Sequence, residues 1–164
     1  MPSKKILSFL LKIEGSIAVV AFLLAAGAVL ADVVGREIFD QGLWGSQKFA
    51  VYAAVTAGFL GIGISTHAGM HIRPRFADNW FPASFEPALT RIAPAITAFL
   101  FFVFAWYAYE FVKESFEYKQ LTPVLDWPMW MIQIVLPYAF VSNGVRNLIY
   151  ALQPELTPSA KGMF

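Results

Sequence analysis

The sequence predicts an all-α integral membrane protein: four transmembrane helices, an interfacial amphipathic segment between the second and third, and both termini in the cytoplasm. Hydrophobic residues make up 58% of the 164-residue chain and charged residues only 14%, against about 25% charged in a typical soluble domain. Apolar runs recur along the chain, and a spanning helix needs about 20 such residues. We therefore expect a single membrane domain, residues 1–164, with little room for an extramembrane domain.

The first transmembrane helix is predicted at about residues 14–35. Lys4, Lys5 and Lys12 precede it, so a cleaved signal peptide is the alternative, but the apolar run of about 20 residues exceeds the usual signal core of about 7–15. Arg36 is one helical turn beyond an aspartate and can pair with it. One face predicts a stripe packed against protein, and it comprises Ala21, Ala25, Ala28, Asp32 and Gly35.

The second helix is predicted at about residues 47–67, after a short loop that places Trp44 at the lipid headgroups. Ser46 is the expected N-cap residue. Small side chains form two ridges that let neighbouring backbones approach on two sides, which suits a helix at the centre of a bundle. One ridge comprises Ala50, Ala54 and Gly58, and the other Ala53, Ala57 and Gly61.

Residues 74–90 are too polar to span, and aromatic side chains alternate there with charged ones, so this segment is expected to lie on the cytoplasmic membrane surface. Pro74, Pro82 and Pro87 should break it into short pieces. The side chains expected to meet lipid headgroups at this surface are His71, Arg73, Arg75 and Trp80.

The third helix is predicted at about residues 91–112, with a continuation as far as 119 left open, and its many aromatic side chains are expected to face lipid. The fourth is predicted at about residues 129–152, with Trp127 and Trp130 at the membrane interface. Pro137 is expected to kink this helix. A polar cluster lies late in this helix and comprises Ser142, Asn143, Arg146 and Asn147. Arg146 is expected to extend to the cytoplasmic headgroups, and the amides could hydrogen-bond a neighbouring helix.

The positions of the basic residues predict the orientation of the chain. With the N-terminus inside, eight of the 12 Lys and Arg residues lie on the cytoplasmic side and four on the other. An excess of Lys and Arg marks cytoplasmic loops. The net charge of +1 is too small to indicate a nucleic-acid partner.

Few residues suggest chemistry, and we predict no catalytic, cofactor-binding or metal site. Without cysteine there is no thiol nucleophile, thiolate metal site or iron–sulfur cluster. His67 and His71 share a helix face and could offer two metal ligands, but no carboxylate completes a zinc site. Asp32 and Arg36 could form an ion relay, because charges in membrane spans often mark one; a structural pair near a helix end is the alternative.

Several short motifs, in their order and spacing, resemble a known family. They are Arg36-Glu-Ile-Phe39, Trp44, Phe59-Leu-Gly61, Gly69-Met-His71-Ile72-Arg73 and Pro82, followed by Thr122, Trp130 and Pro137. The chain resembles the small membrane subunit of tripartite ATP-independent periplasmic (TRAP) transporters, the DctQ-like family. It departs from the family at Gly45-Ser46-Gln47-Lys48 and at Pro74-Arg75, where acidic residues are common.

The resemblance implies a scaffold subunit in the bacterial inner membrane. Its partners would be a large permease, which binds substrate and sodium and moves the substrate by an elevator-like motion, and a periplasmic substrate-binding protein. The substrate would be an organic acid. Phospholipids are expected as further partners. Two other hypotheses stay open: the membrane anchor of a respiratory oxidoreductase, with haem or quinone near His67 or His71, and a free-standing small membrane protein.

Overall fold

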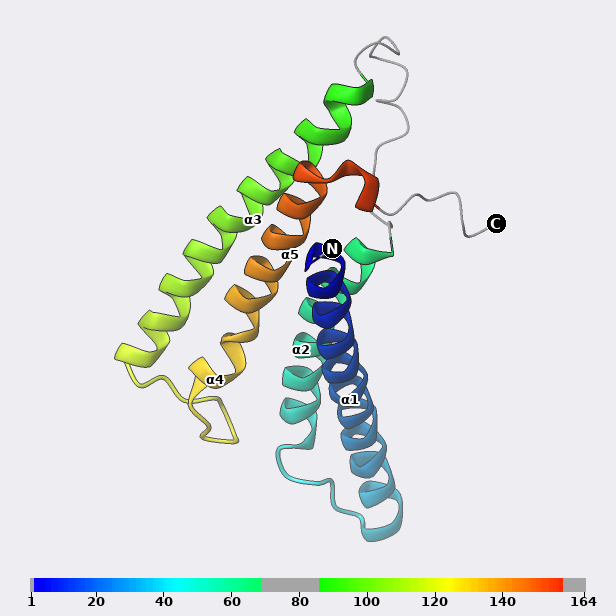
Figure 1. Cartoon of the computed structure of the whole chain (residues 1–164). Helices are drawn as coiled ribbons and strands as arrows, with labels where there is room; N and C mark the ends of the chain where they lie inside the picture. The colour runs from blue at the N-terminus through cyan, green and yellow to red at the C-terminus, as the bar shows by residue number, and fades with distance from the viewer. Residues whose placement is uncertain (1, 69–85, 158–164) are drawn as a thin grey trace.

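The computed structural model describes residues 2–68 and 86–157, and its helices form two antiparallel hairpins (Figure 1). Helices α1 (Pro2–Phe39) and α2 (Ser46–His67) make the first hairpin. Helix α3 (Glu86–Glu117) makes the second with α4 (Met129–Gln133) and α5 (Val135–Leu152). A short 3-10 helix, η3 (Pro154–Leu156), follows α5. The described residues therefore agree with an all-helical membrane fold.

A stripe of mostly small side chains on α1 faces α2. Ala18, Ala21 and Ala25 are buried, and Asp32 and Gly35 continue the same face. Their spacing of three, four or seven residues keeps them on one side of the helix. Small side chains let two helices approach closely, so α1 and α2 pack along most of their length.

The second hairpin is also packed through small residues. Ala98, Ala105 and Ala108 are the buried alanines of α3, and on α5 a Cβ added at Gly144 would lie 2.9 Å from the ring of Phe102. The bulky aromatic side chains of α3 are divided: Phe101 and Phe104 pack on Phe140 of α5, whereas others point outward, as predicted. Phe99, Trp106 and Tyr107 are each more than 60% exposed within the chain.

The predicted fourth helix is interrupted at Ile134, between α4 and α5. Proline has no N–H, so Pro137 cannot donate to the carbonyl of Gln133, and its ring also crowds that carbonyl. The kink expected at Pro137 therefore appears one turn earlier in the chain. The short α4 lies beside the end of α3, where the rings of Phe116 and Trp130 meet edge to face with centroids 5.8 Å apart.

The two hairpins contact each other at several levels. Phe140 of α5 lies edge to face against Phe59 of α2, with ring centroids 5.9 Å apart. Farther along, the loop before α4 meets the start of α2, where Trp127 packs on Phe49 at 6.1 Å between centroids. Near the other ends of α2 and α5, a polar cluster joins the hairpins, as described below.

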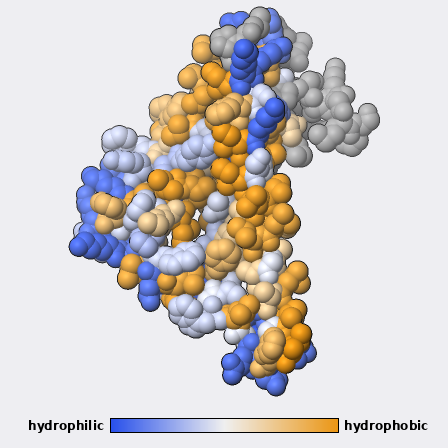
Figure 2. All heavy atoms as spheres, turned by 60° about the horizontal axis from the view of Figure 1, so that its bottom comes forward, coloured by the Kyte–Doolittle hydropathy of each residue, from blue (hydrophilic) through white to orange (hydrophobic). Residues whose placement is uncertain are grey.

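Among the residues that the structure describes, three helices are long and apolar enough to cross a membrane: Ser3–Phe39, Ser46–His67 and Thr90–Glu117. Figure 2 shows hydrophobic residues over the length of the helices and hydrophilic residues gathered at the ends. At 1.5 Å per residue, the 38 residues of α1 extend about 57 Å, well beyond the roughly 30 Å of hydrocarbon in a bilayer. α1 therefore extends outside the hydrocarbon.

Several predicted boundaries differ from the structure. α1 begins at Pro2 and α3 at Glu86, so both helices start before the predicted spans, and α3 ends at Glu117, within the continuation to 119 that the sequence allows. Pro87 does not break the chain, because it lies in the first turn of α3, where a helix tolerates proline. The rest of the predicted interfacial segment, residues 74–85, lies outside the described residues.

The prediction of Ser46 as the N-cap of α2 is wrong. The N-cap is Gly45, which has a left-handed φ of 76°, and the Ser46 hydroxyl donates instead to the carbonyl of Leu43 at 2.8 Å. A Cβ added at Gly45 would lie 2.6 Å from the Leu125 side chain. Glycine is required there both by the backbone conformation and by the approach of the second hairpin.

Candidate functional site: a buried polar cluster joining three helices

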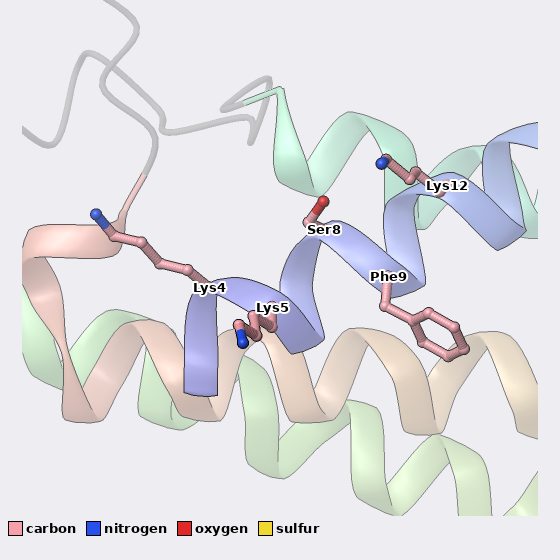
Figure 3. Close-up of a pocket in the computed structure, with 5 residues that line it drawn as sticks. All are labelled: Lys4, Lys5, Ser8, Phe9 and Lys12. Atoms are coloured by element: carbon pink, nitrogen blue, oxygen red, sulfur yellow. The ribbon is translucent and has the colours of Figure 1, made fainter. Parts of the chain in front are cut away.

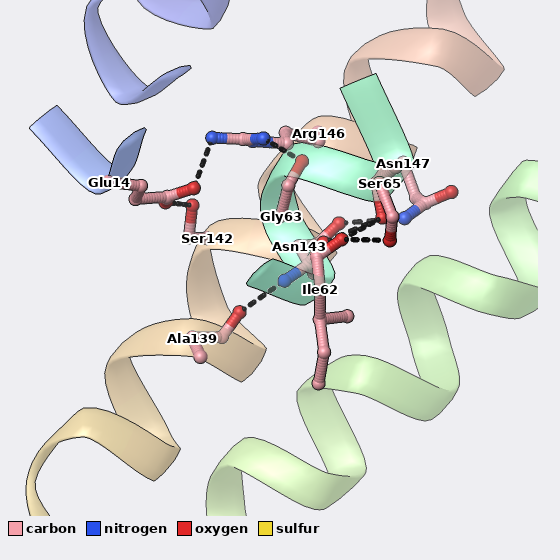
Figure 4. Close-up of polar contacts among 10 residues, drawn as sticks. Glu14, Ile62, Gly63, Ser65, Ala139, Ser142, Asn143, Arg146 and Asn147 are labelled. Carbon is pink, nitrogen blue, oxygen red and sulfur yellow. Dashed lines mark hydrogen bonds and ion pairs between the residues drawn. The ribbon is translucent and has the colours of Figure 1, made fainter. Parts of the chain in front are cut away.

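A salt bridge inside the bundle links α1 to α5 (Figure 4). The Arg146 guanidinium donates to the Glu14 carboxylate with Nη2 2.5 Å from Oε2, and the two side chains are 0% and 1% exposed. Ser142, one turn before Arg146, donates to the other Glu14 oxygen, and Arg146 Nη1 donates to the backbone carbonyl of Gly63 on α2. Groups from three helices thus converge on one ion pair.

Amide and hydroxyl groups extend this cluster along α2 and α5. The Thr66 hydroxyl lies 2.9 Å from Oδ1 of Asn143 and also 2.9 Å from the carbonyl of Ile62, within its own helix. Asn143 donates to the carbonyl of Ala139, and Asn147 donates to the carbonyl of Asn143. The side chains of Thr66, Asn143 and Asn147 are buried. Their hydrogen bonds, to one another and to backbone carbonyls, offset the free-energy cost of removing them from water.

Gly63 is the residue that lets the ion pair form against α2. A Cβ added there would collide with the Glu14 carboxylate and would lie 3.2 Å from Nη1 of Arg146. Any larger residue would push the pair away from the helix. The glycine therefore has a steric role, and its carbonyl is also an acceptor for Arg146.

Some buried polar atoms around the cluster have no hydrogen-bond partner within residues 2–68 and 86–157. They include Nε of Arg146, the hydroxyl of Tyr150 and Nδ1 of His67. The Glu14 carboxylate, by contrast, is paired at both oxygens, since each of them accepts a hydrogen bond. The cluster is suited to holding helices together. Removing one partner of a buried ion pair lowers the stability of a protein much more than replacing both partners with apolar residues.

A second polar group closes the far end of the first hairpin. Asp32, which is 4% exposed, accepts from Arg36 with Nη2 2.9 Å from Oδ2 and from the Gln47 amide of α2 at 3.2 Å. A Cβ added at Gly42 would lie 2.7 Å from Oδ1 of Asp32, so the loop packs directly on this carboxylate. These contacts favour the structural interpretation of Asp32 and Arg36 over a relay.

The predicted packing residues fall in two environments. Ala21, Ala25 and Asp32 are buried against α2, and Ala28 is partly buried. On α2, by contrast, Ala54 and Gly58 are exposed and Ala57 and Gly61 are half-buried; a Cβ at either glycine would meet no atom within 4 Å. Within this chain, α2 instead buries Ala50, Leu60, Gly63 and Thr66.

The residues predicted to lie at the membrane interface also differ in their exposure. Trp44 is 76% exposed, Trp127 is 47% exposed and Trp130 is partly buried. The expectation that Arg146 reaches the lipid headgroups is wrong, because its guanidinium is buried on Glu14. Four further predicted residues, His71, Arg73, Arg75 and Trp80, lie outside the described residues.

The polar group on α5 was expected from the sequence, and the bond between Asn143 and Thr66 of α2 agrees with that expectation. The ion pair was missed because Glu14 appeared to lie at the margin of the first span. Two signals were available. Glu14 precedes Ala18, Ala21 and Ala25 on the same helical face, which places it on the packed side. Ser142, Asn143, Arg146 and Asn147 lie at helical spacing, which indicates a polar face turned toward a partner in the bundle.

The described residues contain no group of three or more His, Cys, Asp or Glu side chains that could hold a metal ion. His67 ends α2 as a lone imidazole in that set, and its predicted companion His71 is among the residues not described. The structure thus gives no support to a metal or haem site built on the described residues.

The fold and the cluster together define a multi-pass helical membrane protein whose buried polar groups bond one another. A family model described as "Tripartite ATP-independent periplasmic transporters, DctQ component" matches residues 15–153. The chain belongs to this family, the small permease subunits of TRAP transporters, whose members are transporter components rather than enzymes. The predicted family resemblance is confirmed, and the match does not support a respiratory membrane anchor.

A named relative agrees with this assignment. The ectoine TRAP transporter small permease protein TeaB of Halomonas elongata is 25% identical over 142 residues, which cover 87% of this chain and 74% of the relative. No solved structure matches the chain. Family membership implies an inner-membrane location and partnership with a large permease and a substrate-binding protein.

Proposed function

We propose that this chain is the small scaffold subunit of a sodium-coupled, binding-protein-dependent TRAP transporter for an organic acid. The substrate and sodium sites belong to the large permease, which moves beside this subunit. The chain provides a fixed support and carries no substrate site of its own. Membership of the DctQ family supports the assignment.

The observation that best supports the proposal is that the buried carboxylates are hydrogen-bonded to other side chains of the chain. Both oxygens of Glu14 accept hydrogen bonds from Ser142 and Arg146, and Asp32 accepts from Arg36 and Gln47. A sodium ion at Glu14 would have to compete with Arg146 and Ser142 for the same carboxylate. Groups bonded in this way stabilise a rigid bundle and are poorly placed for transport.

The small-residue ridges of α2 supply a docking surface for the large permease. Beside Ala54 and Ala57, the positions of Gly58 and Gly61 have open space where a side chain would be. Close helix packing in membranes uses such residues. A helix of the large subunit seated on this ridge would bury the surface that this chain leaves uncovered.

We also propose that α4 and α5 form the fourth span and that both termini are cytoplasmic. α5 is not among the helices that are long and apolar enough by composition to cross a membrane, but its polar side chains are turned inward onto α1 and α2 and buried. An even number of spans places the two ends of the chain on one side. The distribution of Lys and Arg favours the cytoplasm for that side.

Two experiments test the function. Affinity purification of the tagged chain in mild detergent from cells that also express the large permease should recover both subunits. Recovery of the chain alone would favour a free-standing protein. In vesicles under a sodium gradient, the chain by itself should not accumulate an organic acid, and accumulation would contradict the scaffold role.

A further inference from the structure

A basic hollow lies at the start of α1, away from the polar cluster (Figure 3). It is lined by Lys4, Lys5, Ser8, Phe9 and Lys12. At 100° per residue these positions fall on one strip of the helix surface. The opposite side of the same turns carries the buried residues Leu7 and Glu14. The hollow therefore faces the surroundings of the protein and not its interior.

The three ammonium groups of this basic hollow have no carboxylate partner among the described residues. Glu14 is the only acidic residue in the first 31 positions of the sequence, and it is buried on Arg146. Within the part of the chain that the structure describes, the hollow therefore presents three positive charges without a counter-ion and one hydroxyl. This set attracts an anion with several oxygen acceptors, such as a phosphate group.

Exposed apolar side chains continue from the hollow along α1. Phe9 is 64% exposed, and Ile13 and Val20 follow on nearly the same line of the helix with 36% and 55% exposure. A free phosphate would make no use of this surface. A phospholipid would place its headgroup among the lysines and an acyl chain along Phe9 and Ile13.

The hollow also lies at the depth where lipid headgroups are expected. Lys12 lies five residues before the long apolar run of α1, which begins at Ile17, and the length of this helix carries its first turns past the hydrocarbon. Lysines at such a boundary are attracted to anionic lipid surfaces. The position of the hollow, its positive charge and the neighbouring apolar surface thus all indicate an anionic lipid as the ligand.

We propose that the basic hollow of α1 is a binding site for an anionic phospholipid, with the phosphate among Lys4, Lys5, Ser8 and Lys12 and an acyl chain along Phe9 and Ile13. The site is separate from the cluster at Glu14 and from the α2 ridge. It does not depend on the transporter assignment. It requires only that α1 crosses a bilayer.

Native mass spectrometry of the full chain in mild detergent tests the site. Phosphatidylglycerol and phosphatidylcholine with the same acyl chains are added in equal amounts. Phosphatidylglycerol should be retained at least about fivefold better, the ratio expected for one effective lysine contact. Equal retention of the two lipids would overturn the proposal.

Matched variants locate the site. Lys4→Gln/Lys5→Gln/Lys12→Gln should lower phosphatidylglycerol retention by about tenfold or more, whereas the control Lys48→Gln/Lys113→Gln/Lys119→Gln, with the same change of charge, should retain it. Undiminished binding in the first variant would overturn the proposal. If that variant does not fold, the single variants Lys12→Gln and Phe9→Ser test the site instead. Each should weaken phosphatidylglycerol retention, and normal retention in both would contradict the site.

Discussion

Glu14 and Arg146 show how one pair of residues can organise a membrane bundle. Each side chain alone would be a charge removed from water, which is costly. Together they are 0% and 1% exposed, and the carbonyl of Gly63 and the hydroxyl of Ser142 satisfy further bonding positions. The pair joins helices whose residues are far apart in the sequence, so its loss should affect the whole chain.

Replacing Glu14 with alanine should lower the free energy of unfolding by about 3–5 kcal/mol, because Arg146 would remain buried without its counter-ion. Denaturant titration of the purified chain in micelles measures this change. Glu110→Ala is the control, since the contact of Glu110 with Lys113 is exposed and 3.8 Å long, and such pairs contribute about 0–1 kcal/mol.

The double variant Glu14→Leu/Arg146→Met extends this test. Replacing both charges with apolar side chains should restore most of the stability lost in Glu14→Ala. A double variant as unstable as the single one would show that the stability comes from the shape of the site and not from the pairing of charge.

Thr122 is a second residue with a defined structural role. It is 1% exposed, and its hydroxyl oxygen accepts from the backbone N–H of Trp127 at 3.0 Å, inside the loop that leads to α4. Thr122→Val should cost about 1–3 kcal/mol of unfolding free energy by leaving that donor without a partner. Thr122→Ser, which keeps the hydroxyl, should retain most of the stability. Equal losses in both variants would contradict the role of the bond.

At the scale of elements, α2 presents two glycine positions with opposite surroundings. Gly63 touches Glu14 and Arg146, whereas Gly61 has nothing within 4 Å of an added Cβ. Gly63→Leu should therefore unfold the chain itself. Gly61→Leu, like Ala57→Leu, should leave the isolated chain folded but abolish its association with the large permease by overpacking a close helix contact.

Size-exclusion chromatography of the isolated chain and co-purification with the large permease separate these effects. Normal co-purification of Gly61→Leu would show that the permease docks elsewhere. A stable, monodisperse Gly63→Leu chain would contradict the close packing of the ion pair on α2.

At the scale of the whole molecule, the proposal of four spans predicts that both ends of the chain lie on the same side of the membrane. The natural sequence has no cysteine, so single cysteines can be introduced without other changes. Ser3→Cys and Thr157→Cys should react with a membrane-impermeant maleimide only from the cytoplasmic side, and Gln41→Cys and Glu117→Cys only from the other. Labelling of Ser3→Cys and Thr157→Cys from opposite sides would contradict four spans.

The sequence by itself determined the helical membrane class, the core of the first three spans and the break caused by Pro137. These follow from local properties: apolar runs, helical spacing and the missing N–H of proline. The small-residue face of α1 was also readable, because residues on one helical face share a partner. The family resemblance came from short motifs in order along the chain.

Only the tertiary structure decided which groups meet. An arginine near a helix end can extend to lipid headgroups or turn inward, and local sequence favours neither; the position of Glu14 on a neighbouring helix settles it for Arg146. In the same way, only the structure shows that on α2 it is Gly63, and not Gly61, that packs against other helices of this chain. Pairing between distant segments depends on how whole helices pack, and residue patterns within one helix do not contain that information.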